Sequence, residues 1–233
     1  LGYVGLPLLT TFAKTKSCVF TNKPLNRKVI GFDINQSRVN ELTNHQDKTN
    51  SVNKKDIEEC GNNLIFTSNQ NEIRKANIFI ITVPTPINSN KEPDLTFIQK
   101  ATEIVGGAIN KNFVEEKKSN IKPLIIFEST VYPGVTEDIC IPIIEKITNK
   151  KLNQDFFVGY SPERINPGDK KNTLTSIIKV TSGSNKEASR NVDYLYKSII
   201  NAGTHNAASI KIAEASKVIE NTQRDLNIAF VNE

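Results

Sequence analysis

The chain opens with LGYVGLPL (residues 1–8), in which Gly2 and Gly5 stand three residues apart among apolar side chains. This spacing matches the last two glycines of the turn G-x-G-x-x-G. In that turn, glycine lets the backbone approach a pyrophosphate and lets the following helix pack closely on a sheet. Taken alone the stretch is equally compatible with ordinary apolar core, because G-x-x-G is common by chance. As a turn, it makes Gly2, Tyr3, Val4 and Gly5 candidate phosphate contacts.

A carboxylate further along the chain strengthens this interpretation. The apolar stretch KVIGFDI (residues 28–34) places Asp33 at the carboxyl end of an expected strand. An acid there accepts hydrogen bonds from the ribose hydroxyls of a dinucleotide and repels the 2′-phosphate of NADP, which favours NAD. Asp33 lies 28 residues after Gly5 instead of about 20, and a polar loop at 19–28 accounts for the excess. The alternative is that Asp33 only caps the helix that follows.

Short apolar runs alternate with longer helix-like segments along the chain. The expected strands are 28–34, 63–67, 77–84, 123–130, 155–162 and 176–182, and the expected helices are 35–44, 94–112, 135–149 and 185–200. Several of the strands are apolar throughout, as is typical of strands buried on both faces. The alternation predicts an α/β fold, a Rossmann-like doubly wound parallel sheet.

The tail of the chain has a different pattern. From residue 209 to 233 there is neither Pro nor Gly, and apolar residues recur with helical spacing at Ile212, Ala215, Ile219, Leu226 and Phe230. This predicts one long amphipathic helix. We expect two parts: residues 1–203 as a Rossmann-like domain whose first strand is missing, and residues 204–233 as a long connecting helix that starts a second domain. The absence of Met also suggests a piece of a longer product.

Composition narrows the class of protein. A net charge of +5 and a pI near 9.0 suggest an anionic partner, but aromatic residues are not interleaved with the lysines, so nucleic acid is weakly supported. The sequence contains no run of about 18 apolar residues, so no membrane span is predicted. Three widely spaced cysteines, Cys18, Cys60 and Cys140, fit a reducing cytoplasm and inert thiols. With two histidines, a metal site is not expected.

Five sequence blocks in order carry a family resemblance. They are LGYVGLPL, VIGFDINQSRV, TVPTP, FESTVYPG and GYSPERINPGDK, and they cover nearly the whole chain. Together they resemble the UDP-glucose/GDP-mannose dehydrogenase family, whose members use NAD to oxidise the C6 hydroxyl of a nucleotide sugar to a carboxylate. The last block and the tail look most like the branch acting on UDP-N-acetylhexosamines, which makes uronic acids for bacterial surface polysaccharides.

The resemblance also implies roles for individual residues. Lys217 would stabilise the developing oxyanion, Asn221 would support it from the same helix face, and Glu163 would be the general base for thioester hydrolysis. Thr130 would lie near the nicotinamide and the catalytic water, and Arg164 would contact the nucleotide sugar. The further cofactor contacts implied are Ser129, the turn Thr82, Val83, Pro84 and Thr85, and Arg38 on the adenosine phosphate side.

Two departures from the family pattern qualify the resemblance. Where glucose-type members carry a second acid four residues after the position of Glu163, this chain has Pro167, which favours an N-acetylated substrate. The family's nucleophilic cysteine would lie beyond Glu233, and none of the three cysteines occupies its position. Family members commonly dimerise through the region after the long helix, so a homodimer is expected of the full-length protein.

Two other interpretations stay open at this point. One is a different NAD-linked hydroxyacid dehydrogenase that shares the Rossmann half, which would not predict the sequence SPERINPG or the pair Lys217 and Asn221. The other is a truncated, inactive paralogue that only binds NAD.

Overall fold

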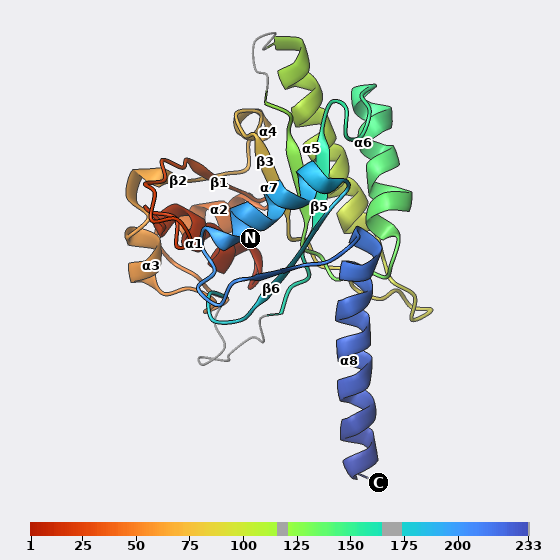
Figure 1. Cartoon of the computed structure of the whole chain (residues 1–233). Helices are drawn as coiled ribbons and strands as arrows, with labels where there is room; N and C mark the ends of the chain where they lie inside the picture. Colours follow the sequence, from red (N-terminus) through yellow and green to blue (C-terminus); the bar gives the residue numbers. More distant parts are fainter. Residues whose placement is uncertain (116–120, 165–173, 233) are drawn as a thin grey trace.

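The molecule has a central β-structure with helices on both of its faces (Figure 1). The computed structural model describes residues 1–115, 121–164 and 174–232. Its strands are β1 (Val29–Phe32), β2 (Leu64–Thr67), β3 (Ile78–Ile81), β4 (Leu124–Phe127), β5 (Phe157–Tyr160), β6 (Lys179–Gly183) and β7 (Thr204–Asn206). Each of the six predicted strand ranges overlaps one of these strands, and β7 was not predicted. The Rossmann-like α/β class is confirmed.

The strands form two sheets, in the orders β1-β2 and β3-β4-β5-β6-β7. All pairs are parallel except β5 with β6, where Gly159 faces Gly183 in an antiparallel register. The predicted parallel sheet therefore contains one antiparallel pair, which was not expected. The apolar runs that identify buried strands carry no information about strand direction, so the reversal was not visible in the sequence.

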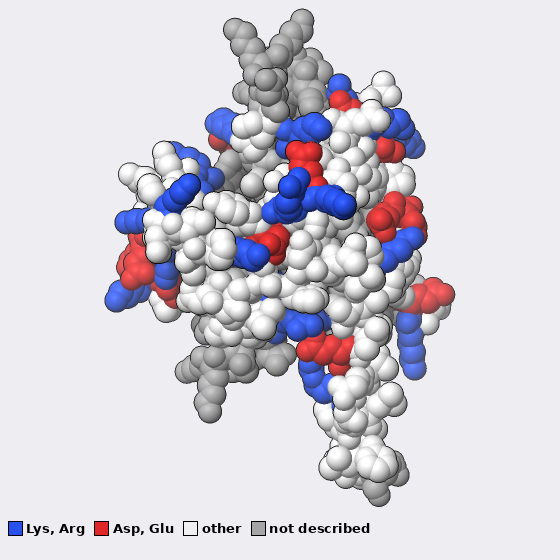
Figure 2. Space-filling model, viewed as in Figure 1, with Lys and Arg blue, Asp and Glu red and all other residues white. Residues whose placement is uncertain are grey.

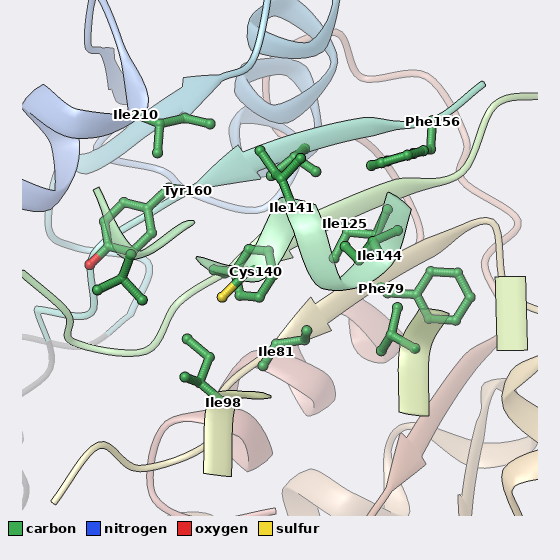
Figure 3. Close-up of a cluster of buried hydrophobic side chains, with 14 of the residues drawn as sticks. Phe79, Ile81, Ile98, Ile125, Cys140, Ile141, Ile144, Phe156, Tyr160 and Ile210 are labelled. Atoms are coloured by element: carbon green, nitrogen blue, oxygen red, sulfur yellow. The ribbon is translucent and has the colours of Figure 1, made fainter. Parts of the chain in front are cut away.

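Strand β4 shows how the sheet is buried on both faces. All four of its residues are buried, and alternate side chains point to opposite faces of a strand. Ile125 and Phe127 join the cluster formed with α5 (Thr96–Glu115) and α6 (Ile141–Thr148), which Figure 3 shows in close-up. Leu124 and Ile126 join the cluster on the other face, formed with α1 (Gly5–Lys14) and α7 (Lys186–Lys197). This is the doubly wound arrangement that the sequence predicted.

The remaining helices connect the strands. They are α2 (Gln36–Thr43), α3 (Lys54–Glu58), α4 (Gln70–Ile73) and a 3₁₀ turn at Gly61–Asn63. The predicted helix at 135–149 begins as a π-helix over Val135–Cys140 and continues as α6. Its start is fixed by Gly134, whose φ of 103° is a left-handed conformation that favours glycine.

A long helix is confirmed as α8 (Ile210–Asn232), which projects away from the body of the molecule (Figure 1). The predicted range 204–233 is wrong at its start, because residues 204–206 form β7, which pairs with β6 and belongs to the domain predicted to end at residue 203. The buried residues of α8 are Ile210, Ala213 and Glu214, all near its start. Most of the apolar residues that defined the predicted stripe, such as Leu226 and Phe230 at 66% and 83% exposure, do not pack on this domain. Figure 2 shows a visible surface free of charged side chains along the far part of the helix. None of the described helices is long and apolar enough to cross a membrane.

Candidate functional site

The turn at the start of the chain leads directly into α1. The amide of Leu6 donates to the carbonyl of Gly2 at 3.0 Å, and no side chain among the described residues caps the start of this helix. Exposed amides at a helix N-terminus favour an anion such as a pyrophosphate. A Cβ on Gly2 would meet nothing within 4 Å, so the space beside the turn is open. A Cβ on Gly5 would lie 2.5 Å from Oγ1 of Thr82, so Gly5 lets the turn after β3 approach this close.

Asp33, directly after β1, lies beside the same turn. Its carboxylate lies against the backbone nitrogen of Leu1 and accepts the backbone amide of Asn35 at 2.9 Å. The N-cap of α2 is Asn35, whose side chain accepts the amides of Ser37 and Arg38. Asp33 is thus not the helix cap that the alternative interpretation required. An open glycine turn beside a carboxylate at a strand end fits the pyrophosphate and ribose of a dinucleotide.

Arg38 lies close to this corner, but its guanidinium is occupied. Its Nε donates to the carbonyl of Leu1 at 2.9 Å, and its other nitrogens pair with Glu41 and, at 2.7 Å, with Asp47. Against the effect of burial, hydrogen bonds from Thr49 and Arg38 lower the pKa of Asp47 to about 2. Arg38 therefore holds the segment after α2 against the turn, and a contact with the adenosine phosphate stays a prediction.

The carboxyl ends of β3, β4 and β5 meet at one edge of the sheet. The hydroxyl of Ser129 donates to the carbonyl of Val83 at 2.6 Å, and that of Thr85 donates to the carbonyl of Thr130. These bonds join the turn Thr82–Thr85 to the segment that follows β4. Tyr160, the last residue of β5, donates from its hydroxyl to the carbonyl of Ser129 at 3.1 Å.

Helix α8 is fixed to the same edge by a buried carboxylate. Glu214 accepts the backbone amides of Gly134 at 2.6 Å and Thr136 at 3.0 Å, at the start of the π-helix. Burial raises the pKa of Glu214, with these hydrogen bonds acting in the opposite direction. Lys217 follows one helical turn later and is half-buried.

The segment after β5 lies against this helix. Arg164 pairs with Glu220 of α8 at 2.8 Å. Burial lowers the pKa of Lys217, while the carboxylates of Glu163 and Glu220 oppose that shift. Asn221 is half-buried on the turn of α8 that follows Lys217. Pro167 lies outside the described residues.

A buried group of charges behind Glu163 was not predicted. Lys179, the first residue of β6, lies 2.8 Å from Glu128 and 3.8 Å from Glu163, and the hydroxyl of Tyr196 donates to Glu128. The signals were present in the sequence, since a lysine interrupts the apolar run SIIKVTS and a glutamate ends LIIFE. Charged side chains are almost never fully buried unless they are paired, so a charge inside a buried apolar run indicates a partner nearby.

The cysteines are all buried. Burial raises the pKa of Cys140 to about 12 and that of Cys60 to about 11, which disfavours the reactive thiolate. A hydrogen bond from Thr21 lowers the pKa of Cys18, but its side chain is 1% exposed. Among the residues with described positions, no three His, Cys, Asp or Glu side chains gather as metal ligands.

Comparisons with known proteins identify the family of the chain. Residues 1–200 match the UDP-glucose/GDP-mannose dehydrogenase family, NAD binding domain. Over all 233 residues, the chain is 52% identical to a UDP-N-acetyl-D-glucosamine 6-dehydrogenase of Pseudomonas aeruginosa and 50% identical to one of Salmonella typhi, covering 50% of each. A solved UDP-D-ManNAc dehydrogenase of Pyrococcus horikoshii superposes with a TM-score of 0.83 at 27% identity, over the whole chain and 51% of that structure. The chain spans about half the length of the curated relatives it matches.

Proposed function

Since the chain belongs to the UDP-glucose/GDP-mannose dehydrogenase family and matches its NAD binding domain, we propose that it is the cofactor half of an NAD-dependent nucleotide-sugar 6-dehydrogenase. The substrate class we propose is a UDP-N-acetylhexosamine, oxidised at C6 to the uronic acid. The observation that carries the proposal is the ion pair between Arg164 and Glu220 at 2.8 Å, because it holds the segment of Glu163 after β5 against α8, the helix of Lys217.

The cofactor fits the corner formed by the first turn and Asp33. The open space at Gly2 and the uncapped start of α1 would accept the pyrophosphate, and the Asp33 carboxylate would accept the ribose hydroxyls. Tyr3 and Val4 complete this turn. When bound, NAD accepts the hydride that leaves C6 of the sugar. Thr82–Thr85, Ser129 and Thr130 would line its path at the ends of β3 and β4.

The chain's own residues would manage the proton and the developing charge. The ammonium of Lys217 would stabilise the sugar alkoxide as the hydroxyl proton leaves, with Asn221 supporting it one turn later. Arg164 would contact the nucleotide sugar from the same side. Glu163 would take a proton from the water that releases the acid in the second half of the reaction, and Thr130 would orient that water.

The second oxidation would also need a nucleophilic thiol. We expect it outside this chain, since Cys18, Cys60 and Cys140 are buried and lie at none of the family's catalytic positions. The activity is accordingly proposed for the full-length protein, by which we mean a protein that carries this chain at the length of its relatives.

The choice of an N-acetylated substrate is supported by the relatives. Two that are 52% and 50% identical are UDP-N-acetyl-D-glucosamine 6-dehydrogenases. By analogy with its branch of the family, we further propose that the protein works in the cytoplasm as a homodimer and supplies uronic acids for surface polysaccharide.

The proposal is tested by NADH production from the full-length protein with UDP-GlcNAc, UDP-GalNAc, UDP-ManNAc and UDP-glucose in parallel. We expect turnover with at least one N-acetylated sugar and much weaker turnover with UDP-glucose. Turnover with UDP-glucose alone would refute the substrate class, and no turnover with any of the four would refute the activity.

A further inference from the structure

Three charged side chains from three different elements meet inside the protein. Glu128 follows β4, Lys179 begins β6 and Glu163 follows β5, and their side chains are 0%, 3% and 7% exposed. The ammonium of Lys179 lies 2.8 Å from Oε2 of Glu128 and 3.8 Å from Oε2 of Glu163. Buried charges persist only where they are paired, so the three groups form one electrostatic unit.

The unit has two carboxylates and one ammonium, so the carboxylates compete for it. Attraction falls with distance, and Glu128 holds the shorter contact. The hydroxyl of Tyr196 donates to the other oxygen of Glu128, and burial raises the pKa of Tyr196 well above its usual range, which keeps that proton in place. Burial also raises the pKa of Glu128, while Lys179 acts in the opposite direction.

Lys179 is well placed to control the position of Glu163. Its backbone is held in β6, where its amide donates to the carbonyl of Gly203 at 3.2 Å. Its ammonium also donates to the carbonyl of Pro162 at 3.3 Å, directly before Glu163. One fixed side chain thus contacts both the backbone and the carboxylate of the segment that carries the proposed base.

Other groups face Glu163 from the elements packed around it. Among the described residues they include Lys217 of α8 and Tyr196 of α7, besides Glu128 and Lys179. Arg164 follows Glu163 on its own segment and is paired with Glu220. Lys217 faces the substrate side in the proposed mechanism, whereas Lys179 lies in the interior.

We propose that Lys179 is a positioning residue that holds the Glu163 carboxylate ionised and oriented for proton transfer, and that Glu128 limits how strongly it does so. The inference rests on the proposed role of Glu163 as general base. A protonated Glu163 cannot take a proton from water, so the water-activating step fails at low pH. In this proposal, Lys179 and Glu128 set the pH at which that failure begins.

Opposite substitutions test this assignment in the full-length protein. Glu128→Gln removes the competing charge and keeps an acceptor for Tyr196, so Lys179 acts more fully on Glu163. We expect the acid limb of the kcat profile to move to lower pH by about half a unit to one unit, a size typical of a changed close charge contact. The double variant Glu128→Gln with Lys179→Met removes both charges of the closer pair and also takes the Lys179 ammonium away from Glu163, so it should move the limb to higher pH.

A conservative variant of Lys179 and a direct titration of Glu163 serve as controls for these two variants. Lys179→Arg, with Glu128 kept, retains the charge, so its acid limb should stay close to that of the wild type, with KM little changed in all variants. Glutamate side-chain ¹³C NMR of the full-length protein, with the Glu163 signal assigned by Glu163→Gln, should show the same opposite displacements of its titration midpoint.

The outcomes separate this inference from the proposed function. If the wild-type protein turns over no nucleotide sugar, the function fails, and the carboxyl titration still decides the electrostatic control of Glu163 by Lys179. If activity is present but both the acid limb and the Glu163 titration stay unchanged, or move in the same direction in the two variants, the inference is overturned.

Discussion

The carboxylate of Glu214, on α8, accepts the backbone amide of Gly134, at the start of the π-helix, at 2.6 Å. Two residues 80 positions apart thereby fix the long helix to the loop after β4. Because Lys217 lies one turn further along α8, this contact also fixes the position of Lys217.

Replacing this carboxylate should destabilise the protein. Glu214→Ala leaves the buried amides of Gly134 and Thr136 without their acceptor, and we expect a loss of at least about 2 kcal/mol in the free energy of unfolding, measured by urea denaturation. Asp225→Ala, on the exposed part of the same helix, should lose much less. Equal losses in the two variants would contradict the anchoring role.

The same residue predicts a pH dependence of stability. Burial raises the pKa of Glu214 in the folded state above its unfolded value of about 4.3. A carboxyl with a raised folded pKa contributes stability that is present at low pH and is lost as pH rises through the folded pKa. The unfolding free energy of the wild type should therefore fall relative to that of Glu214→Gln from about pH 4.3 upward. An unfolding free energy of the wild type that rises with pH relative to that of Glu214→Gln would contradict the prediction.

The close approach at Gly5 predicts a steric effect on cofactor binding. Gly5→Ala places a Cβ 2.5 Å from Oγ1 of Thr82, so the turn or the threonine must move. We expect NAD affinity, measured by calorimetry, to fall by about tenfold or more, equivalent to about 1.4 kcal/mol. Gly107→Ala is the matched control, since a Cβ there meets nothing within 4 Å in the middle of α5, and it should leave NAD binding unchanged and stabilise the helix by about 1 kcal/mol.

Asp33 should decide between the two nicotinamide cofactors. In Asp33→Asn the charged acceptor for the ribose hydroxyls is lost, and we expect about tenfold weaker NAD binding and a smaller preference over NADP. Because Asn35 caps α2, the thermal unfolding midpoint should change little. Unchanged affinities for both cofactors would remove Asp33 from the site.

Lys217→Ala in the full-length protein should lower kcat by about 10²-fold or more, the size of effect typical of a lost oxyanion contact, while NAD affinity stays nearly unchanged. Burial lowers the pKa of Lys217, so the wild-type rate should fall with rising pH earlier than for an ordinary lysine. Lys211→Ala, on the exposed side of the same helix, is the control and should leave kcat unchanged. An unaltered kcat in Lys217→Ala would remove Lys217 from the mechanism.

The sequence predicted most of the sheet, because buried strands are apolar runs of the right length. It also predicted α8 from its spacing of apolar residues. The strand Thr204–Asn206 was not predicted because three polar residues show no strand pattern. The antiparallel direction of β6 was not predicted because an apolar run reads the same for parallel and antiparallel strands.

The site residues came from the family resemblance, whereas their supports did not. Glu128 lies in the block FESTVYPG but was given no role, and Lys179 and Glu214 lie outside the five blocks. Each of the three interacts with a partner far away in the chain. Such pairings depend on how elements pack in space. A charge inside an apolar run signals only that a partner must exist, not which residue supplies it.

The anchoring of α8 at one end makes the helix a lever with its pivot at Glu214. Phe230 lies about 24 Å along the axis from that pivot, so a tilt of about 10° would carry it through about 4 Å. The same tilt would displace Lys217, about 4.5 Å from the pivot, by less than about 1 Å. Movements at the apolar end of the helix would therefore reach the lysine strongly attenuated.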